Sequence, residues 1–154
     1  MGRLRRRQHR DPAEVSVSER PAIPKPIPKP DELNAEFYEH CAKEKLCFQR
    51  CNACRTWRHL PRSMCAKCGS TDWEWEESSG RGRIFSWTVT HQALHPAFAG
   101  DVPFAVVVVE LEEGVRIVSG LRNLPPGEIT LDLPVEVEFE RVSEQIALPY
   151  FHPR

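Results

Sequence analysis

The sequence contains no apolar segment long enough to cross a membrane, because its longest apolar run extends only from Phe104 to Val109. The basic N-terminus, Met1–Arg7, is followed by no apolar stretch, so we expect no secretory signal. Arg6 excludes a myristoylation motif, which needs serine or threonine at that position. A reducing cytoplasm is therefore the expected location, where cysteines bind metals more often than they form disulfides.

The sequence also lacks the short motifs that mark common active sites. It has no GxSxG nucleophile elbow and no phosphate-binding P-loop, and Gly80-Arg81-Gly82 is too short for a dinucleotide fingerprint. The six histidines are scattered, and no pair of carboxylates can be assigned to one pocket. We therefore predict no catalytic residues and expect no enzymatic activity from this chain on its own.

Charge is nearly balanced overall but unevenly distributed. The net charge is −1, yet the first ten residues carry five arginines and no acid, which leaves −6 for the remaining residues. Nucleic-acid binding is one function to consider for this chain, and a module with that function needs a basic groove. The C-terminal half instead carries many acidic residues: Glu110, Glu112, Glu113, Glu128, Asp132, Glu136, Glu138 and Glu140. Only the N-terminal arm is suited to contact a polyanion.

The sequence does contain two CxxC pairs, Cys51 with Cys54 and Cys65 with Cys68, which are separated by ten residues. A CxxC turn aims both sulfurs at one point, and two facing turns make a tetrahedral thiolate cage that suits zinc. Gly69 allows a tight backbone turn behind the second pair. We predict one structural zinc ion held by these four cysteines, with no open position to activate water. The alternatives are chance pairs or a disulfide framework.

Three nearby residues are weaker candidates for the metal centre. His59 lies in the loop between the two pairs and could replace a cysteine ligand. Cys47 precedes Cys51 by four residues, which is the wrong spacing for another CxxC, so we predict a free thiol. Cys41 is assigned to the hydrophobic core. Iron is the alternative metal for such a site, in which case the protein would be coloured and redox-active.

The N-terminal region is predicted to contain an arm and a proline-rich strap, together spanning residues 1–30. Residues 1–22 have no apolar periodicity and are predicted to be disordered. The tetrapeptide Ile-Pro-Lys-Pro then occurs twice, at residues 23–26 and 27–30, and predicts an extended polyproline-II segment. This strap is either a spacer or a segment that lies in a partner's groove.

A helix and the zinc ribbon are predicted to follow, at residues 31–45 and 46–72. Leu33, Phe37 and Cys41 recur every four residues, which predicts one apolar helix face between about Asp31 and Lys43. The alternating segment 46–50 predicts a short strand that enters the first CxxC pair.

Residues 73–154 are predicted to form an OB-fold, so that the whole chain is mainly β. The apolar run from Phe104 to Leu111 is expected to be buried on both faces, and the aromatic segment 148–153 to lie on the barrel. Five antiparallel strands on about 75 residues suit a Greek-key barrel of the OB type. The predicted strands are Trp73–Glu76, Arg83–His91, Phe104–Leu111, Val115–Leu121 and Val135–Val142.

Taken together, these landmarks resemble the domain of unknown function thirty-five family over roughly residues 31–154. The resemblance implies an N-terminal helix, a rubredoxin-like zinc ribbon and a C-terminal OB-fold that is often acyl-CoA-associated. It does not extend to the arginine-rich arm or to the Ile-Pro-Lys-Pro repeat. The matching segments are Phe37-Tyr38, the two CxxC pairs with Gly69-Ser70, Trp75, residues 79–82 leading into strand 84–89, residues 95–98, and Pro103-Phe104.

The resemblance also implies a partner protein rather than a self-sufficient enzyme. Such proteins accompany thiolase-like subunits, including lipid-transfer-protein-like thiolases and aldolases that cleave carbon–carbon bonds in acyl-CoA thioesters. Typical settings are steroid side-chain degradation and aromatic-compound degradation. We therefore expect a non-catalytic auxiliary subunit that stabilises its partner and helps to form the CoA channel, in a two-plus-two heterotetramer.

Contact with CoA is predicted for one group of residues near the rim of the barrel. Arginine side chains at turns can bind phosphate, and aromatic side chains can line an apolar wall. Two histidines near the rim are either ligand contacts or structural residues, and each arginine taken singly is also consistent with a solvated surface charge. The candidate residues are Arg81, Arg83, Trp87, His91, His95, Phe98, Phe104 and Arg122.

Overall fold

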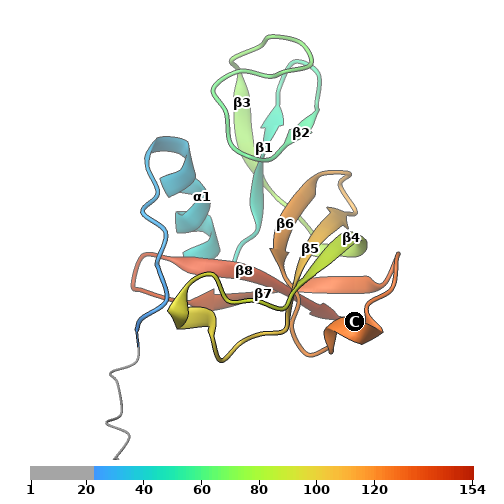
Figure 1. Ribbon diagram of the computed structural model, residues 1–154. Coiled ribbons are helices and arrows are strands. Elements are labelled where there is room, and N and C mark those ends of the chain that lie inside the picture. The colour runs from blue at the N-terminus through green and yellow to red at the C-terminus, as the bar shows by residue number, and fades with distance from the viewer. Residues whose placement is uncertain (1–22) are drawn as a thin grey trace, which may run out of the picture.

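The computed structural model describes residues 23–154, in which one α-helix lies beside two β-sheets (Figure 1). The arm predicted for residues 1–22 lies outside this range. No helix of the described part is long and apolar enough to span a membrane. The helix and strands are α1 (Glu32–Ala42), β1 (Cys47–Cys51), β2 (Trp57–Arg58), β3 (Trp73–Glu77), β4 (Arg81–Thr90), β5 (Phe104–Leu111), β6 (Arg116–Gly120), β7 (Pro134–Arg141) and β8 (Ala147–Pro153).

Helix α1 precedes both sheets in the sequence and packs against each of them. Its limits agree with the sequence prediction to within one residue at each end. Phe37 and Cys41 are buried on its apolar face. The indole N–H of Trp75, in β3, donates to Glu36 Oε2 at 2.6 Å. The guanidinium of Arg141, at the end of β7, donates to the carbonyl of Ala42 at 2.6 Å. The helix is thus tied to the ribbon at one point and to the barrel at another.

The smaller sheet has the order β2-β1-β3 and forms the zinc ribbon. Strand β3 pairs antiparallel with β1 from Cys47 opposite Glu77 to Cys51 opposite Trp73. The prediction that Trp73–Glu76 is a barrel strand was therefore wrong. The alternation of tryptophan and glutamate identified a strand, but period two does not reveal which strand pairs with it.

The larger sheet is a five-stranded barrel with the order β6-β5-β4-β7-β8, and its neighbouring strands are antiparallel. It closes where the end of β6 meets β8 in parallel, at the bridge between Leu121 and Phe151. The backbone N–H of Arg122 donates to Phe151 O at 2.8 Å at this point. This arrangement confirms the predicted OB-type barrel.

Two expectations about the barrel strands were wrong. The aromatic segment that was expected to lie on the barrel is itself strand β8, and it pairs with β7 from Ala147 opposite Arg141 to Pro153 opposite Val135. Strand β5 is buried on one face rather than two, because only alternate residues point into the core. Val107 and Val109 are completely buried, whereas Val106 and Val108 remain partly exposed. A closed antiparallel barrel needs only one apolar face.

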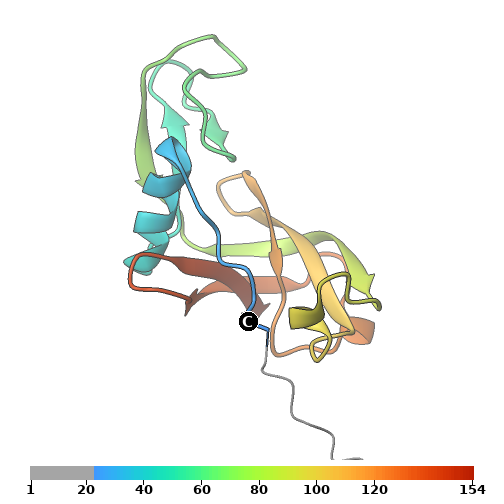
Figure 2. The same cartoon turned by 60° about the vertical axis from the view of Figure 1, so that its left-hand side comes forward.

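The ribbon is joined to the barrel by three residues, Ser78 to Gly80, which lie between β3 and β4. The turn between β5 and β6 holds this connection in place. Glu113, in that turn, accepts hydrogen bonds from Ser79 N at 2.6 Å and from Ser78 Oγ at 2.8 Å. Burial opposes its ionisation, but these hydrogen bonds leave the Glu113 pKa below its ordinary value. Gly80 has φ +71°, and a Cβ there would lie 2.5 Å from Val137. Figure 2 shows the ribbon projecting from one side of the barrel.

Candidate zinc centre and adjoining clefts

The two CxxC turns have the same backbone geometry. In the first, Arg55 N donates to Cys51 O at 2.8 Å, and Cys51 N donates to Thr56 O at 3.0 Å. In the second, Gly69 N donates to Cys65 O and Cys65 N donates to Ser70 O, both at 2.8 Å. Gly69 adopts φ +75°, the left-handed conformation that glycine reaches without a steric penalty. Each turn therefore presents its two sulfurs to the other.

The four thiols are placed as zinc ligands would be. All four Sγ atoms lie within 4.8 Å of one another, and both Cys51–Cys68 and Cys54–Cys65 are separated by 3.6 Å. Zn–S bonds of ~2.3 Å in a tetrahedron place sulfurs about 3.8 Å apart. A hydrogen bond with Thr56 Oγ1 lowers the pKa of Cys54 to about 6, which favours the thiolate. The cage fits one structural zinc ion.

The remaining candidate ligands lie elsewhere. His59 packs between the rings of Phe37 and Phe48, each 5.2 Å away between centroids, and burial lowers its pKa to about 4. Cys41 is completely buried, which raises its pKa to about 12 and confirms its assignment to the core. Cys47 is also buried and is not part of the four-cysteine group.

The three arginines predicted to contact CoA are all paired with acidic residues. Arg81 forms an ion pair with Glu112 at 3.2 Å. Arg83 pairs with Glu110 at 2.7 Å and with Asp132 at 3.0 Å. Arg122 pairs with two carboxylates of β7 and lies over the ring of Tyr150, 3.8 Å from its centroid. A phosphate at any of these positions would compete with an existing ion pair.

The aromatic candidates form a separate group from Arg81 and Arg83. His95, Phe98 and Phe104 lie together, with centroid distances of 6.1 Å between His95 and Phe98 and 6.2 Å between Phe98 and Phe104. Phe104 pairs with Thr90, at the C-terminal end of β4, and His91 follows that residue. Arg81 begins the same strand, nine residues earlier, which is roughly 30 Å measured along the strand at ~3.3 Å per residue. Trp87 lies between the two ends.

One rim contact was not predicted from the sequence. The Lys25 ammonium, from the strap, lies 5.5 Å from the Phe98 ring centroid and forms an ion pair with Asp101 at 2.6 Å. The hydrogen bond to Asp101 raises the pKa of Lys25. The strap therefore contacts the barrel at the rim, although nothing in the sequence connects Lys25 with a loop more than seventy residues later.

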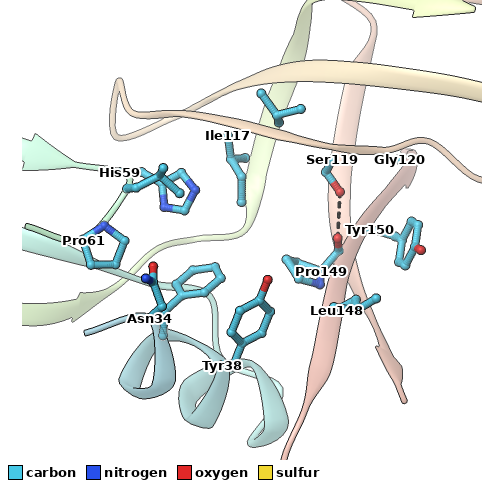
Figure 3. A pocket seen from close by; sticks show the side chains of 13 residues that line it. Asn34, Tyr38, His59, Pro61, Ile117, Ser119, Gly120, Leu148, Pro149 and Tyr150 are labelled. Carbon is cyan, nitrogen blue, oxygen red and sulfur yellow. Dashed lines mark hydrogen bonds between the residues drawn. The ribbon is translucent and has the colours of Figure 1, made fainter. Parts of the chain in front are cut away.

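A cleft of about 300 Å³ between helix and barrel was also missed. The Tyr38 side chain projects from α1 towards β6 and β8, where Ser119 Oγ donates to the carbonyl of Pro149 at 2.7 Å (Figure 3). A Cβ on Gly120 would lie 2.8 Å from the Tyr150 ring, so the strands approach closely there. Four segments far apart in the sequence line this cleft: α1, the loop at residues 59–61, β6 and β8.

Comparison with known families agrees with this architecture. Residues 39–74 match a family model described as "ChsH2, rubredoxin-like zinc ribbon domain". Residues 75–140 match a second, described as "ChsH2, C-terminal OB-fold domain". The boundary between the two matches falls within β3, the strand that leads from the ribbon towards the barrel.

Two curated relatives extend the comparison. Over 137 residues, 89% of this chain, it is 36% identical to a "probable enoyl-CoA hydratase alpha subunit" of Thermomonospora curvata. The match spans only 42% of that protein's length. A "DUF35 domain-containing scaffold protein" of Methanocaldococcus jannaschii is 31% identical over 117 residues, which are 74% of this chain and 82% of the relative.

A solved structure also matches over most of the chain. It is titled "Ltp2-ChsH2(DUF35) aldolase", and the matching chain is 38% identical with a TM-score of 0.75. The alignment covers 82% of this chain and 98% of the other. The chain therefore belongs to the DUF35 family, with a ChsH2-type zinc ribbon followed by an OB-fold.

Proposed function

We propose that this chain is a non-catalytic auxiliary subunit of a thiolase-like or aldolase complex that acts on acyl-CoA thioesters in the cytoplasm. The observation that carries the proposal is the match over 98% of a DUF35 chain from an aldolase complex. The hydratase relative supports a CoA thioester as the substrate class. Degradation of steroid side chains or of aromatic compounds is the proposed setting, and a two-plus-two heterotetramer is the proposed assembly.

In this proposal the chain acts by holding its partner and by completing the wall of the CoA channel. The zinc centre stabilises the ribbon, and the barrel fixes the loops that face the partner. Leu94, in the segment after β4, is 92% exposed and lies beside the cluster of His95, Phe98 and Phe104. Such an apolar residue at a rim is suited to become buried against another subunit.

Co-expression with a thiolase-like or lipid-transfer-protein-like subunit tests the proposal directly. We expect the two chains to copurify at equal stoichiometry, and the partner to lose most of its carbon–carbon bond cleaving activity when this chain is withheld. Size-exclusion chromatography with light scattering, followed by an acyl-CoA cleavage assay, measures both effects. A stable monomer that binds no thiolase homologue, or a partner that is fully active alone, would contradict the proposal.

We propose further that residues of the candidate group contact CoA within the complex, with Arg81 and Arg122 binding phosphate. Their ion pairs are at least partly exposed, so a phosphate can replace a carboxylate at modest cost. Arg81→Ala or Arg122→Ala is then expected to raise the apparent KM for acyl-CoA roughly ten-fold. Zinc content and thermal stability should change less than KM does.

A matched control for these variants is Lys45→Ala, which removes an exposed ion pair with Glu77 at 2.8 Å from a residue outside the candidate group. Steady-state kinetics of the complex with each variant separates the effects. If Arg81→Ala and Arg122→Ala both behave like the wild-type complex, the partner alone holds the CoA and this chain acts only as a scaffold.

A further inference from the structure

A second and larger cleft, of about 510 Å³, separates the ribbon from the hairpin of β5 and β6. The ribbon contributes residues from β2, from the loop after it and from the second CxxC turn, and the hairpin contributes Glu110 and residues 114–116. Four basic side chains line the cleft, whereas Glu110 is its single acidic side chain. The basic residues are Arg58, Arg62, Lys67 and Arg116.

No carboxylate within residues 23–154 is free to neutralise the basic side chains of this cleft. Glu110 is already engaged by Arg83 and Arg116, both at 2.7 Å, and these contacts lower its pKa. Arg58, Arg62 and Lys67 form no ion pair with any described residue. An anion entering the cleft would therefore meet three cations without a carboxylate competitor.

Unpartnered polar atoms are concentrated at the same place. Within the described part of the chain, every buried side-chain nitrogen or oxygen without a hydrogen-bond partner belongs to Gln49, Arg58 or His59. In Arg58 all three guanidinium nitrogens are buried and unpartnered. In Gln49 the amide nitrogen is unpartnered, while Oε1 accepts a hydrogen bond from the backbone N–H of Arg62 at 2.8 Å. The guanidinium and the amide nitrogen are donors, so the missing group is an acceptor.

The unpartnered Arg58 guanidinium is positively charged, so the missing hydrogen-bond acceptor should carry negative charge. A buried guanidinium without a counter-charge is costly, and native proteins rarely leave one in that state. The thiolates of the zinc centre do not supply the partner, because Arg58 donates a hydrogen bond to none of the four sulfurs. Its guanidinium carbon instead lies 5.8 Å from the ring centroid of Trp73.

We propose that this cleft binds the phosphate group of a small molecule, with Arg58 as its main contact. A phosphate carries up to two negative charges and several acceptor oxygens, and the planar guanidinium fork can bind two of them at once. The cleft is larger than one phosphate, and Trp57 and Met64 supply an apolar wall for the rest of the ligand. The inference rests on these residues and not on the proposed function.

Titration of the zinc-loaded full chain with inorganic phosphate, pyrophosphate and ADP tests the proposal, with sodium chloride at matched ionic strength as the reference. Isothermal titration calorimetry is expected to show one site per chain, and thermal unfolding is expected to shift upwards with each phosphate compound. Tighter binding of ADP than of pyrophosphate would indicate that the apolar wall holds an organic moiety, whereas equal binding would indicate recognition of phosphate alone. No response beyond that to chloride would overturn the proposal.

Arg58→Met is expected to weaken phosphate binding at least ten-fold. Its melting temperature without phosphate should equal or exceed that of the wild type, because a buried unpaired charge has been removed. Lys67→Gln changes an exposed residue of the cleft and should weaken phosphate binding less than Arg58→Met does. This second variant tests the proposal if Arg58→Met does not fold. Lys29→Met, an exposed strap residue outside the cleft, is the control for a general change in charge. Equal phosphate affinity in Arg58→Met, Lys67→Gln and the wild type would overturn the assignment.

Discussion

Replacing Cys65 by alanine is expected to release the zinc ion and to unfold the ribbon. The thiol is buried and its Sγ lies 3.6 Å from that of Cys54, and alanine offers no ligand atom in its place. Structural zinc centres contribute on the order of 10 kcal/mol of apparent binding free energy, which is comparable with the whole stability of a domain. Metal analysis should fall from one zinc per chain to near zero, with loss of the near-ultraviolet circular dichroism of Trp57, Trp73 and Trp75.

Cys47→Ser is the matched control, because Cys47 is a buried cysteine that does not belong to the four-cysteine group. This variant should keep its zinc and lose only a modest amount of stability. One zinc per chain that survives Cys65→Ala would show that the ligand assignment is wrong. A red, redox-active preparation would instead indicate iron.

The second large effect is expected at Phe48, in β1. The side chain is completely buried and packs against Phe37 of α1 and His59 of the ribbon loop. The distances between ring centroids are 6.3 Å to Phe37 and 5.2 Å to His59. Phe48→Ala removes the group on which helix and loop both pack. We expect a loss of about 3–5 kcal/mol in the free energy of unfolding, because the cavity cannot collapse without moving α1. Urea unfolding followed by circular dichroism measures it.

Phe85→Ala is the control for this substitution. Phe85 lies in β4 and is 43% exposed, with the Arg116 guanidinium stacked 3.4 Å from its ring centroid. The loss should be about 1 kcal/mol, since mainly the stacking contact disappears. Equal losses for the two phenylalanines would mean that Phe48 does not hold the helix to the ribbon.

The features predicted from the sequence are those that short segments determine. The CxxC spacing specified the four-cysteine cage, because each turn is closed by hydrogen bonds within six residues. The apolar periodicity located α1 to within a residue at each end, and the limits of β5 were predicted as observed. Four of the five predicted barrel strands are present in the barrel, as β4, β5, β6 and β7, and these were enough to identify the OB-type barrel.

The features that were not predicted depend on pairs of distant residues. Strand β3 pairs with the ribbon because Trp73 lies opposite Cys51, a register that no local pattern reveals. Arg83 meets Asp132 across 49 residues of sequence, so its ion pair could not be foreseen when it was assigned to phosphate binding. The positive cleft likewise combines Arg58 with Arg116, which lie in different sheets.

The short connection between ribbon and barrel has a consequence for assembly. Ser78 and Ser79 are bound to Glu113, and Ser78 N also donates to Leu46 O at 2.8 Å, so the joint is held from both sides. A surface that spans the ribbon and the barrel is therefore preorganised before any encounter. A partner that binds both parts loses little conformational entropy in aligning them, and more of the contact energy remains as affinity.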